Sequence, residues 1–221
     1  YPKMMDSDIH TQNKKYYSVA LYLAIFTILY NIAEGIIATD FGAEDESLTL
    51  FGFGADSFIE VISGSGIVLM IARIKQNPES ARSDYEKQAL KITGIAFYLL
   101  VLLLVVTAAI SIYSGHQPLT TFWGVCISLI SIAIMWFTII WKLKVGKALN
   151  SPAIIADAEC ARVCIYMSFV LLLSSGLYYA FKLPYVDATG SLFLAYFSFK
   201  EGKECFEKAN NEALCACNHH H

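Results

Sequence analysis

Two acidic residues stand four positions apart in an otherwise apolar stretch of the chain. Asp56 and Glu60 lie within Leu48–Ile74, and this spacing places both side chains on one face of a helix. An ionisable group inside a membrane costs at least about 2.5 kcal/mol, so the pair requires a compensating partner. Two carboxylates one turn apart repel each other unless they are protonated or share a cation. The pair therefore indicates a cation site. Alternatively, internal hydrogen bonds or a position near the membrane surface compensate for the cost of the two carboxylates.

A second group with metal-binding chemistry lies in the apolar stretch Ile154–Phe181. Asp157, Cys160 and Cys164 follow one another at i, i+3 and i+7 and share a helix face. Thiolates bind borderline and soft metal ions, and carboxylates also bind them. A disulfide between the two cysteines is not expected, because Cβ atoms at i and i+4 stand about 5–6 Å apart and a disulfide requires about 4 Å. Alternatively, the cysteines are small packing residues between helices.

Three further polar residues interrupt apolar segments. Asn31 and Glu34 are three positions apart in the first such segment, where they line an ion path or make a hydrogen bond between helices. Arg162 lies between the two cysteines on a different face. We expect it to pair with Glu34 or Asp157, or else to extend toward the membrane surface.

The composition places these residues in a membrane protein. Apolar residues make up 56% of the 221 residues, and charged residues make up 16%, against about 25% in soluble domains. A membrane-spanning helix needs about 20 mostly apolar residues. The sequence predicts an all-α membrane protein with six transmembrane helices, over Tyr16–Thr39, Leu48–Ile74, Ile92–Tyr113, Leu119–Trp141, Ile154–Phe181 and Val186–Phe199.

The distribution of basic residues predicts the orientation. With the N-terminus inside, all of the 16 Lys and Arg residues except Arg162 and Lys182 fall in cytoplasmic segments, and Lys142 is counted among them. Because cytoplasmic loops are enriched in Lys and Arg, we expect both termini in the cytoplasm, in the plasma (inner) membrane.

Three regions follow from this assignment. Residues 1–15 form a cytoplasmic N-terminal segment, in which we expect Tyr1–Asn13 to be polar and mobile, residues 16–209 form the six-helix membrane domain, and residues 210–221 form a C-terminal tail. Its last residues, His219 to His221, have the character of a tag remnant. The six cysteines fall in no segment predicted to be outside, so we expect free thiols.

Both groups of candidate ligands resemble motifs of the cation diffusion facilitator family. Ser47–Gly64 (SLTLFGFGADSFIEVISG) is similar to that family's second span, and Ser151–Cys164 (SPAIIADAECARVC) to its fifth. The family carries an H-x-x-x-D or D-x-x-x-D pair in each span, and the two pairs form one tetrahedral metal site. Further similar stretches are Asn31-x-x-Glu34-Gly35, Tyr185–Gly190 (YVDATG) and Phe197–Ala209 (FSFKEGKECFEKA). They cover nearly all of the membrane part, in order.

The sequence differs from the family pattern in two respects. The resemblance ends with the membrane part and includes no counterpart of the cytoplasmic domain of many members, so a homodimer, which the family implies, would form through the membrane helices. The usual His and Asp ligands are replaced by four residues: Asp56, Glu60, Cys160 and Cys164.

These observations predict a secondary transporter, not an enzyme, that exports Zn²⁺ or Cd²⁺ from the cytoplasm. Two thiolates and two carboxylates suit these ions better than Mg²⁺. Because four ionised ligands exceed the charge of a dication, the empty site would hold protons that metal binding expels, which supports proton antiport. Lipid and the metal cation are the expected partners, and nucleic acid is not. The alternatives are a non-transporting metal sensor or subunit and, with less support, a dithiol membrane oxidoreductase.

Overall fold

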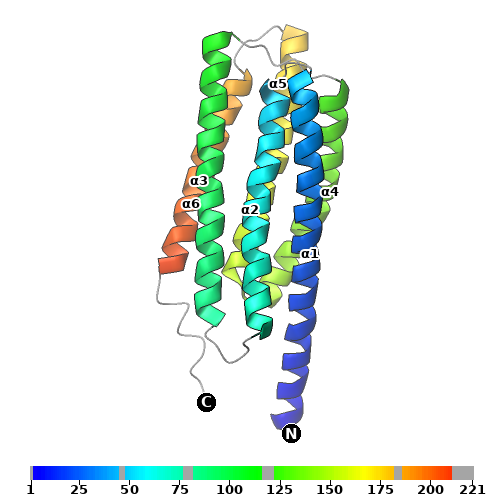
Figure 1. Cartoon of the computed structure of the whole chain (residues 1–221), viewed down its shortest axis with the longest axis vertical. Helices are drawn as coiled ribbons and strands as arrows, with labels where there is room; N and C mark the ends of the chain where they lie inside the picture. Colours follow the sequence, from blue (N-terminus) through cyan, green and yellow to red (C-terminus); the bar gives the residue numbers. More distant parts are fainter. Residues whose placement is uncertain (1, 45–47, 77–81, 116–121, 182–185, 211–221) are drawn as a thin grey trace.

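The computed structural model shows a bundle of six helices (Figure 1). It describes residues 2–44, 48–76, 82–115, 122–181 and 186–210, and all regular secondary structure in these ranges is helical. The helices are α1 (Pro2–Glu44), α2 (Leu48–Gln76), α3 (Arg82–Ser114), α4 (Phe122–Ala148), α5 (Pro152–Phe181) and α6 (Val186–Asn210).

Successive helices run up and down and close into a ring. The ring order is α1, α2, α3, α6, α5 and α4, and α4 packs against α1 again. Two further contacts, α2 with α5 and α3 with α5, cross the ring. The helices that carry the two candidate ligand pairs therefore meet in the middle of the bundle, although more than 90 residues separate them along the chain.

Basic residues gather at one end of the bundle. The helices α1, α3 and α5 begin there, and α2, α4 and α6 end there (the lower end in Figure 1). The last turn of each of these three helices carries basic residues: Arg73 and Lys75 in α2, Lys147 in α4, and Lys208 in α6. Positive charge at a helix C-terminus also complements the helix dipole. We call this end of the molecule the basic end.

The exterior of the bundle is apolar and part of its interior is polar, unlike in a soluble protein. Large apolar side chains face outward, among them Tyr22, Leu29, Leu102, Trp136 and Phe193, each more than 60% exposed. The interior instead holds Asn31, Glu34, Asp56, Ser57, Glu60 and Ser63, each less than 5% exposed. Only lipid makes this arrangement favourable, because it solvates the apolar exterior and leaves the polar groups to satisfy one another.

The helices are longer than the predicted spans, chiefly at the basic end. α1 begins at Pro2, so nearly all of the segment Tyr1–Asn13, predicted to be mobile, is helical, and α6 continues to Asn210. Four helices contain a stretch that is long and apolar enough to cross a membrane: Lys15–Ala43, Leu50–Gln76, Ser83–Ser114 and Val125–Ala148. In the described parts of α5 and α6 no stretch meets that criterion. Crossing by all six helices therefore stays a prediction.

Glycines let α1 and α2 approach closely next to the candidate site. A Cβ atom on Gly54 of α2 would lie 2.7 Å from the backbone nitrogen of Thr39 and 3.0 Å from the carbonyl oxygen of Gly35, both in α1. A Cβ atom on Gly35 would in turn lie 3.1 Å from the carbonyl oxygen of Gly54. The two backbones are in contact here, as small residues permit in membrane helices. This contact brings the polar face of α1 against that of α2.

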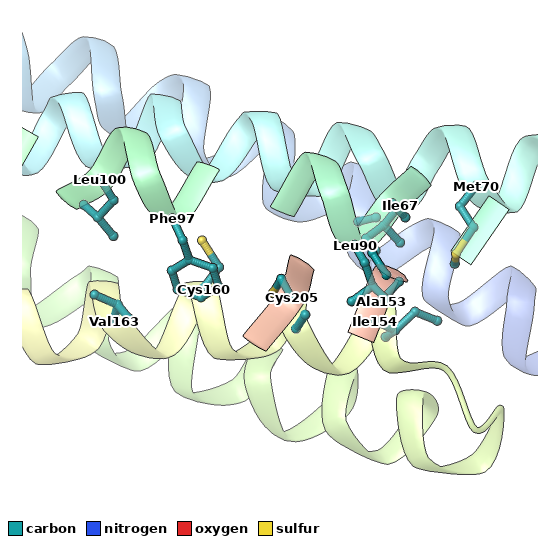
Figure 2. Close-up of a cluster of buried hydrophobic side chains, with 14 of the residues drawn as sticks. Ile67, Met70, Leu90, Phe97, Leu100, Ala153, Ile154, Cys160, Val163 and Cys205 are labelled. Atoms are coloured by element: carbon teal, nitrogen blue, oxygen red, sulfur yellow. The ribbon is translucent and has the colours of Figure 1, made fainter. Parts of the chain in front are cut away.

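The half of the bundle nearer the basic end is packed with apolar side chains. Figure 2 shows part of this cluster, including Ile67, Met70, Leu90 and Ile154, which are at most 2% exposed. Cys160 belongs to the same cluster. We call it the inner apolar cluster; it extends from the level of the candidate site, where it includes Cys160, toward the basic end.

A buried carboxylate holds the start of α5. Glu86 of α3 accepts hydrogen bonds from the Ser151 hydroxyl (2.9 Å) and the Ala153 backbone nitrogen (3.2 Å). The chain enters α5 after Asn150, which has φ 51°, and the Ser151 hydroxyl also accepts a bond from the Ile154 nitrogen (3.4 Å). Negative charge at a helix N-terminus is favourable, so Glu86 fixes the position from which α5 carries its cysteines.

Candidate metal centre

The two candidate ligand pairs touch through one residue of each. The Cys164 thiol of α5 donates a hydrogen bond to Asp56 Oδ2 of α2 over 2.7 Å. Both side chains are at most 1% exposed. The contact places a sulfur and a carboxylate from different helices within reach of a single ion. A thiol donor also satisfies the carboxylate while no cation is bound.

Glu60, one turn from Asp56, is held by α1. Asn31 Nδ2 donates to Glu60 Oε2 over 2.5 Å. The other oxygens of these two groups, Glu60 Oε1 and Asn31 Oδ1, are buried and have no hydrogen-bond partner in the described part of the chain. Two unsatisfied buried oxygens are costly, and a cation is one of the groups that would satisfy them.

Glu34 extends this polar layer across α1 and α2. It accepts hydrogen bonds from the Ser57 hydroxyl (3.0 Å) and the Tyr30 hydroxyl (2.8 Å). Glu34 is 4% exposed and does not contact Arg162. The bond from Ser57 connects α2 with α1, whereas Tyr30 lies one turn earlier in α1 itself. The position of Glu34 beside Asp56 and Glu60 makes it part of the same acidic layer.

Cys160 lies one turn from Cys164 toward the basic end. It is 2% exposed, and it lies within electrostatic range of Glu60, Asp56 and Asp157. The four described cysteines, Cys126, Cys160, Cys164 and Cys205, are free thiols as expected. Cys215 and Cys217 lie outside the described residues.

Asp157 has partners of its own, on the basic-end side of Cys160. Its Oδ2 pairs with Lys142 Nζ of α4 at 2.8 Å, and its Oδ1 accepts from the Ser63 hydroxyl of α2 at 2.7 Å. Lys142 and Asp157 are each only 3% exposed. The assignment of Lys142 to a cytoplasmic loop was therefore wrong: α4 continues past Trp141 and carries the lysine inside the bundle.

The expected partners of Arg162 were also wrong. Its Nη1 pairs with Glu159 Oε2 at 2.7 Å, three residues earlier on the same helix. Both side chains are partly exposed, at 35% and 19%. Arg162 lies on the side of α5 that points away from the polar interior, so it takes no part in the candidate site.

The arrangement joins two of the four candidate ligands, Asp56 and Cys164, and does not yet form a cage. Asp56 contacts Cys164, Glu60 contacts Asn31, and no set of three His, Cys, Asp or Glu side chains in the described ranges converges on one point. Side-chain rotation is therefore required before Asp56, Glu60, Cys160 and Cys164 can surround one ion. The residues are buried between two helices that are in contact, so the required movements are local.

Sequence reasoning missed Lys142, although the sequence contains a signal for it. Ser128, Ser131, Met135 and Thr138 recur every three to four residues along α4 and are all buried, and Lys142 continues this stripe. A periodicity of 3.6 places them on one helix face. The aromatic residue Trp141 was instead interpreted as the end of the span. Extending the stripe by one turn would have placed Lys142 inside the bundle.

A comparison with known families agrees with this architecture. Residues 19–210 match the family described as the cation efflux transmembrane domain. The match includes α2 to α6 and most of α1, with all four candidate ligands.

Proposed function

The chain belongs to the cation efflux family, and from this premise we propose that it exports a divalent transition-metal cation, Zn²⁺ or Cd²⁺, from the cytoplasm in exchange for protons. Members of the family are membrane proteins that transport metal cations and are not enzymes. The ion, the direction of transport and the exchanged proton are the parts of this proposal that go beyond family membership.

The contact between Asp56 and Cys164 supports the location of the site. It brings the second and fifth helices together through side chains that bind metals, at a depth where both are buried. Glu60 and Cys160 lie one turn away on the same two helices, toward the basic end. A dication that replaces the thiol hydrogen between Asp56 and Cys164 would attract the unsatisfied Glu60 oxygen and the Cys160 sulfur.

The ligand set supports the choice of ion. Two sulfurs and two carboxylates suit Zn²⁺ and Cd²⁺, which accept four ligands including thiolates, whereas Mg²⁺ requires six oxygens. The proton coupling rests on the same set. Thiols must lose their protons to bind a metal, so metal binding releases protons from the site. Protonation of the thiols in turn favours release of the metal.

The membrane arrangement completes the proposal. All six helices cross the bilayer, the basic end faces the cytoplasm, and both termini lie on that side of the plasma membrane. The chain acts as a homodimer through its membrane helices. Support for the orientation comes from the Arg and Lys residues at the ends of α2, α4 and α6.

Flux measurements on proteoliposomes test the function. Purified protein is reconstituted, Zn²⁺ or Cd²⁺ is added to one side, and metal uptake and luminal pH are followed together. We expect the parent protein to move metal and protons in opposite directions and Glu60→Ala to lose both fluxes. Glu207→Ala is the matched control, since this carboxylate is 61% exposed near the end of α6 and pairs only with Lys203 among the described residues.

Three results would each change the conclusion. Metal flux without proton movement would remove the antiport. Metal binding without flux in the parent protein would favour a sensor or assembly subunit. Full flux in Glu60→Ala would move the site away from α2.

A further inference from the structure

A polar cluster connects four helices beside the candidate ligands. Lys142 of α4 pairs with Asp157 of α5, Ser63 of α2 donates to Asp157, and Ser63 Oγ lies 3.1 Å from Thr93 Oγ1 of α3. All four side chains are at most 3% exposed. We call Lys142, Asp157, Ser63 and Thr93 the four-helix clasp.

The clasp lies between the candidate ligands and the basic end. Asp157 precedes Cys160 by three residues in α5, which runs away from the basic end. Ser63 follows Glu60 by three residues in α2, which runs toward it. Three residues correspond to about 4.5 Å along a helix axis, so the clasp is about one turn from the lower pair of ligands.

Beyond the clasp the packing toward the basic end is mainly apolar, and the buried Glu86 there is already bonded to Ser151 and to the Ala153 nitrogen. The inner apolar cluster places Ile67, Leu90 and Ile154 there, each at most 2% exposed (Figure 2). A hydrated ion cannot pass such a layer without separation of the helices. The clasp is therefore the polar group that an ion from the basic end meets immediately before the candidate ligands.

We propose that the Lys142–Asp157 ion pair is the gate on the basic-end side of the ion site, and that it must part before a dication can reach Glu60 and Cys160 from the cytoplasm. This inference rests on the proposed function and orientation. In the closed arrangement the Lys142 ammonium repels an incoming dication, and both Asp157 oxygens are already occupied. When the pair parts, Asp157 becomes available to the cation about one helical turn before Glu60 and Cys160.

A purely structural role explains the pair less well. Replacement of a buried ion pair by apolar residues of similar size is often neutral or stabilising for folding, so the bundle does not require these charges in order to fold. Charged groups inside a membrane are costly and mark ion pathways. An ion pair that blocks the ion path in one state and opens it to a cation in another explains why these costly charges are present.

Thiol labelling of Cys160 tests the gate without any metal. The other five cysteines (Cys126, Cys164, Cys205, Cys215 and Cys217) are replaced by Ser, and the full chain in membrane vesicles is exposed to an impermeant maleimide from one side at a time. We expect Lys142→Met to raise the labelling rate from the cytoplasmic side by about tenfold or more, because the coupling of close buried charge pairs exceeds the free energy of a tenfold change. Labelling from the opposite side should not change.

Further variants separate a gate from a structural contact. The double variant Lys142→Met with Asp157→Leu leaves no unpaired charge, so it serves as the test if Lys142→Met does not fold. Its Cys160 should also be labelled faster than that of the parent. The exchange Lys142→Asp with Asp157→Lys should restore slow labelling. Lys208→Met is the matched control, because it breaks an exposed ion pair with Glu204 near the same end. It should label at the parent rate.

Unchanged labelling in folded Lys142→Met or in the double variant would overturn the gate. That result is independent of the flux assay. Loss of flux in Glu60→Ala together with unchanged labelling would leave the transport function standing and remove the gate. If the variants are labelled faster but the parent protein moves no metal, the gated cavity stands and the transport function is rejected.

Discussion

Asn31 in α1 donates a hydrogen bond to Glu60 in α2 over 2.5 Å, deep in the bundle. The amide is the only described hydrogen-bond donor to this carboxylate, and Glu60 Oε1 has no partner within the described ranges. α1 therefore holds the candidate ligand Glu60 of α2 through one carboxylate oxygen and leaves the other oxygen without a hydrogen bond. Removal of the Asn31 amide provides a way to measure whether a cation binds this carboxylate.

Asn31→Ala should destabilise the metal-free protein by about 1–3 kcal/mol, because it leaves a buried acceptor without its donor. Saturating Cd²⁺ should shrink that difference, since the ion takes over the role of the amide. Thermal unfolding in detergent, with and without Cd²⁺, measures both effects. Thr27→Val is the matched control: among the described residues its hydroxyl bonds only to the Leu23 carbonyl in α1, so its variant should respond to Cd²⁺ like the parent. Equal stabilisation of Asn31→Ala and parent by Cd²⁺ would place Glu60 outside the ion site.

Cys164→Ser should lower the affinity for Cd²⁺ by about tenfold or more and should change Mn²⁺ binding much less, because it exchanges a soft sulfur for a hard oxygen. Competition against a chromophoric chelator gives both affinities, and the ultraviolet charge-transfer absorption of a Cd–thiolate bond reports the sulfur directly. Cys205→Ser removes a thiol that lies in α6, away from Asp56, and should leave both unchanged. A uniform loss for all ions would contradict a direct Cys164 ligand.

Gly54→Ala should destabilise the bundle by about 1–3 kcal/mol, because the added methyl group meets backbone atoms of α1 at 2.7 and 3.0 Å that cannot move independently. Gly52→Ala on the same helix is the control. Its new methyl group would lie 3.4 Å from the Thr107 side chain, an ordinary contact, and alanine favours the helix. Unfolding temperatures in one detergent compare the two. Equal unfolding temperatures for both variants would argue against the close α1–α2 contact.

Glu86→Ala should cost about 1–3 kcal/mol, since it removes the acceptor of Ser151 and of the Ala153 nitrogen at the start of α5. Asp84→Ala, two residues earlier on the exposed side of α3, should have little effect. Hydrogen exchange of the first turn of α5 provides a local readout beside the unfolding temperature. Unchanged exchange there in Glu86→Ala would show that another group holds the helix end.

The orientation can be checked with introduced cysteines at exposed positions at opposite ends of the bundle. In a variant without other cysteines, Lys147→Cys should react with an impermeant thiol reagent only from the cytoplasmic side and Ser114→Cys only from the outer side. The expectation follows from the charge bias and from α3 and α4 ending at opposite ends of the bundle. Reaction of both from the same side would exclude the six-span topology.

The sequence alone determined the helical architecture and the approximate position of the site. Apolar runs of about 20 residues form helices in lipid because no water is available to satisfy the backbone, so hydropathy predicted the bundle. The spacing of Asp56 and Glu60, and of Cys160 and Cys164, placed each pair on one helix face because the helix period is a local property. The order of the motifs predicted the family, which the match over residues 19–210 confirms.

Only the tertiary structure decided which side chains meet. The pairing of Cys164 with Asp56, of Asn31 with Glu60 and of Lys142 with Asp157 joins residues that are 108, 29 and 15 positions apart. Such contacts depend on the rotation and depth of whole helices, which packing at Gly35 and Gly54 sets. Lys142 shows the difference most clearly. Its charge predicted a loop, but one further turn of α4 and a carboxylate on the neighbouring helix place it inside the membrane domain.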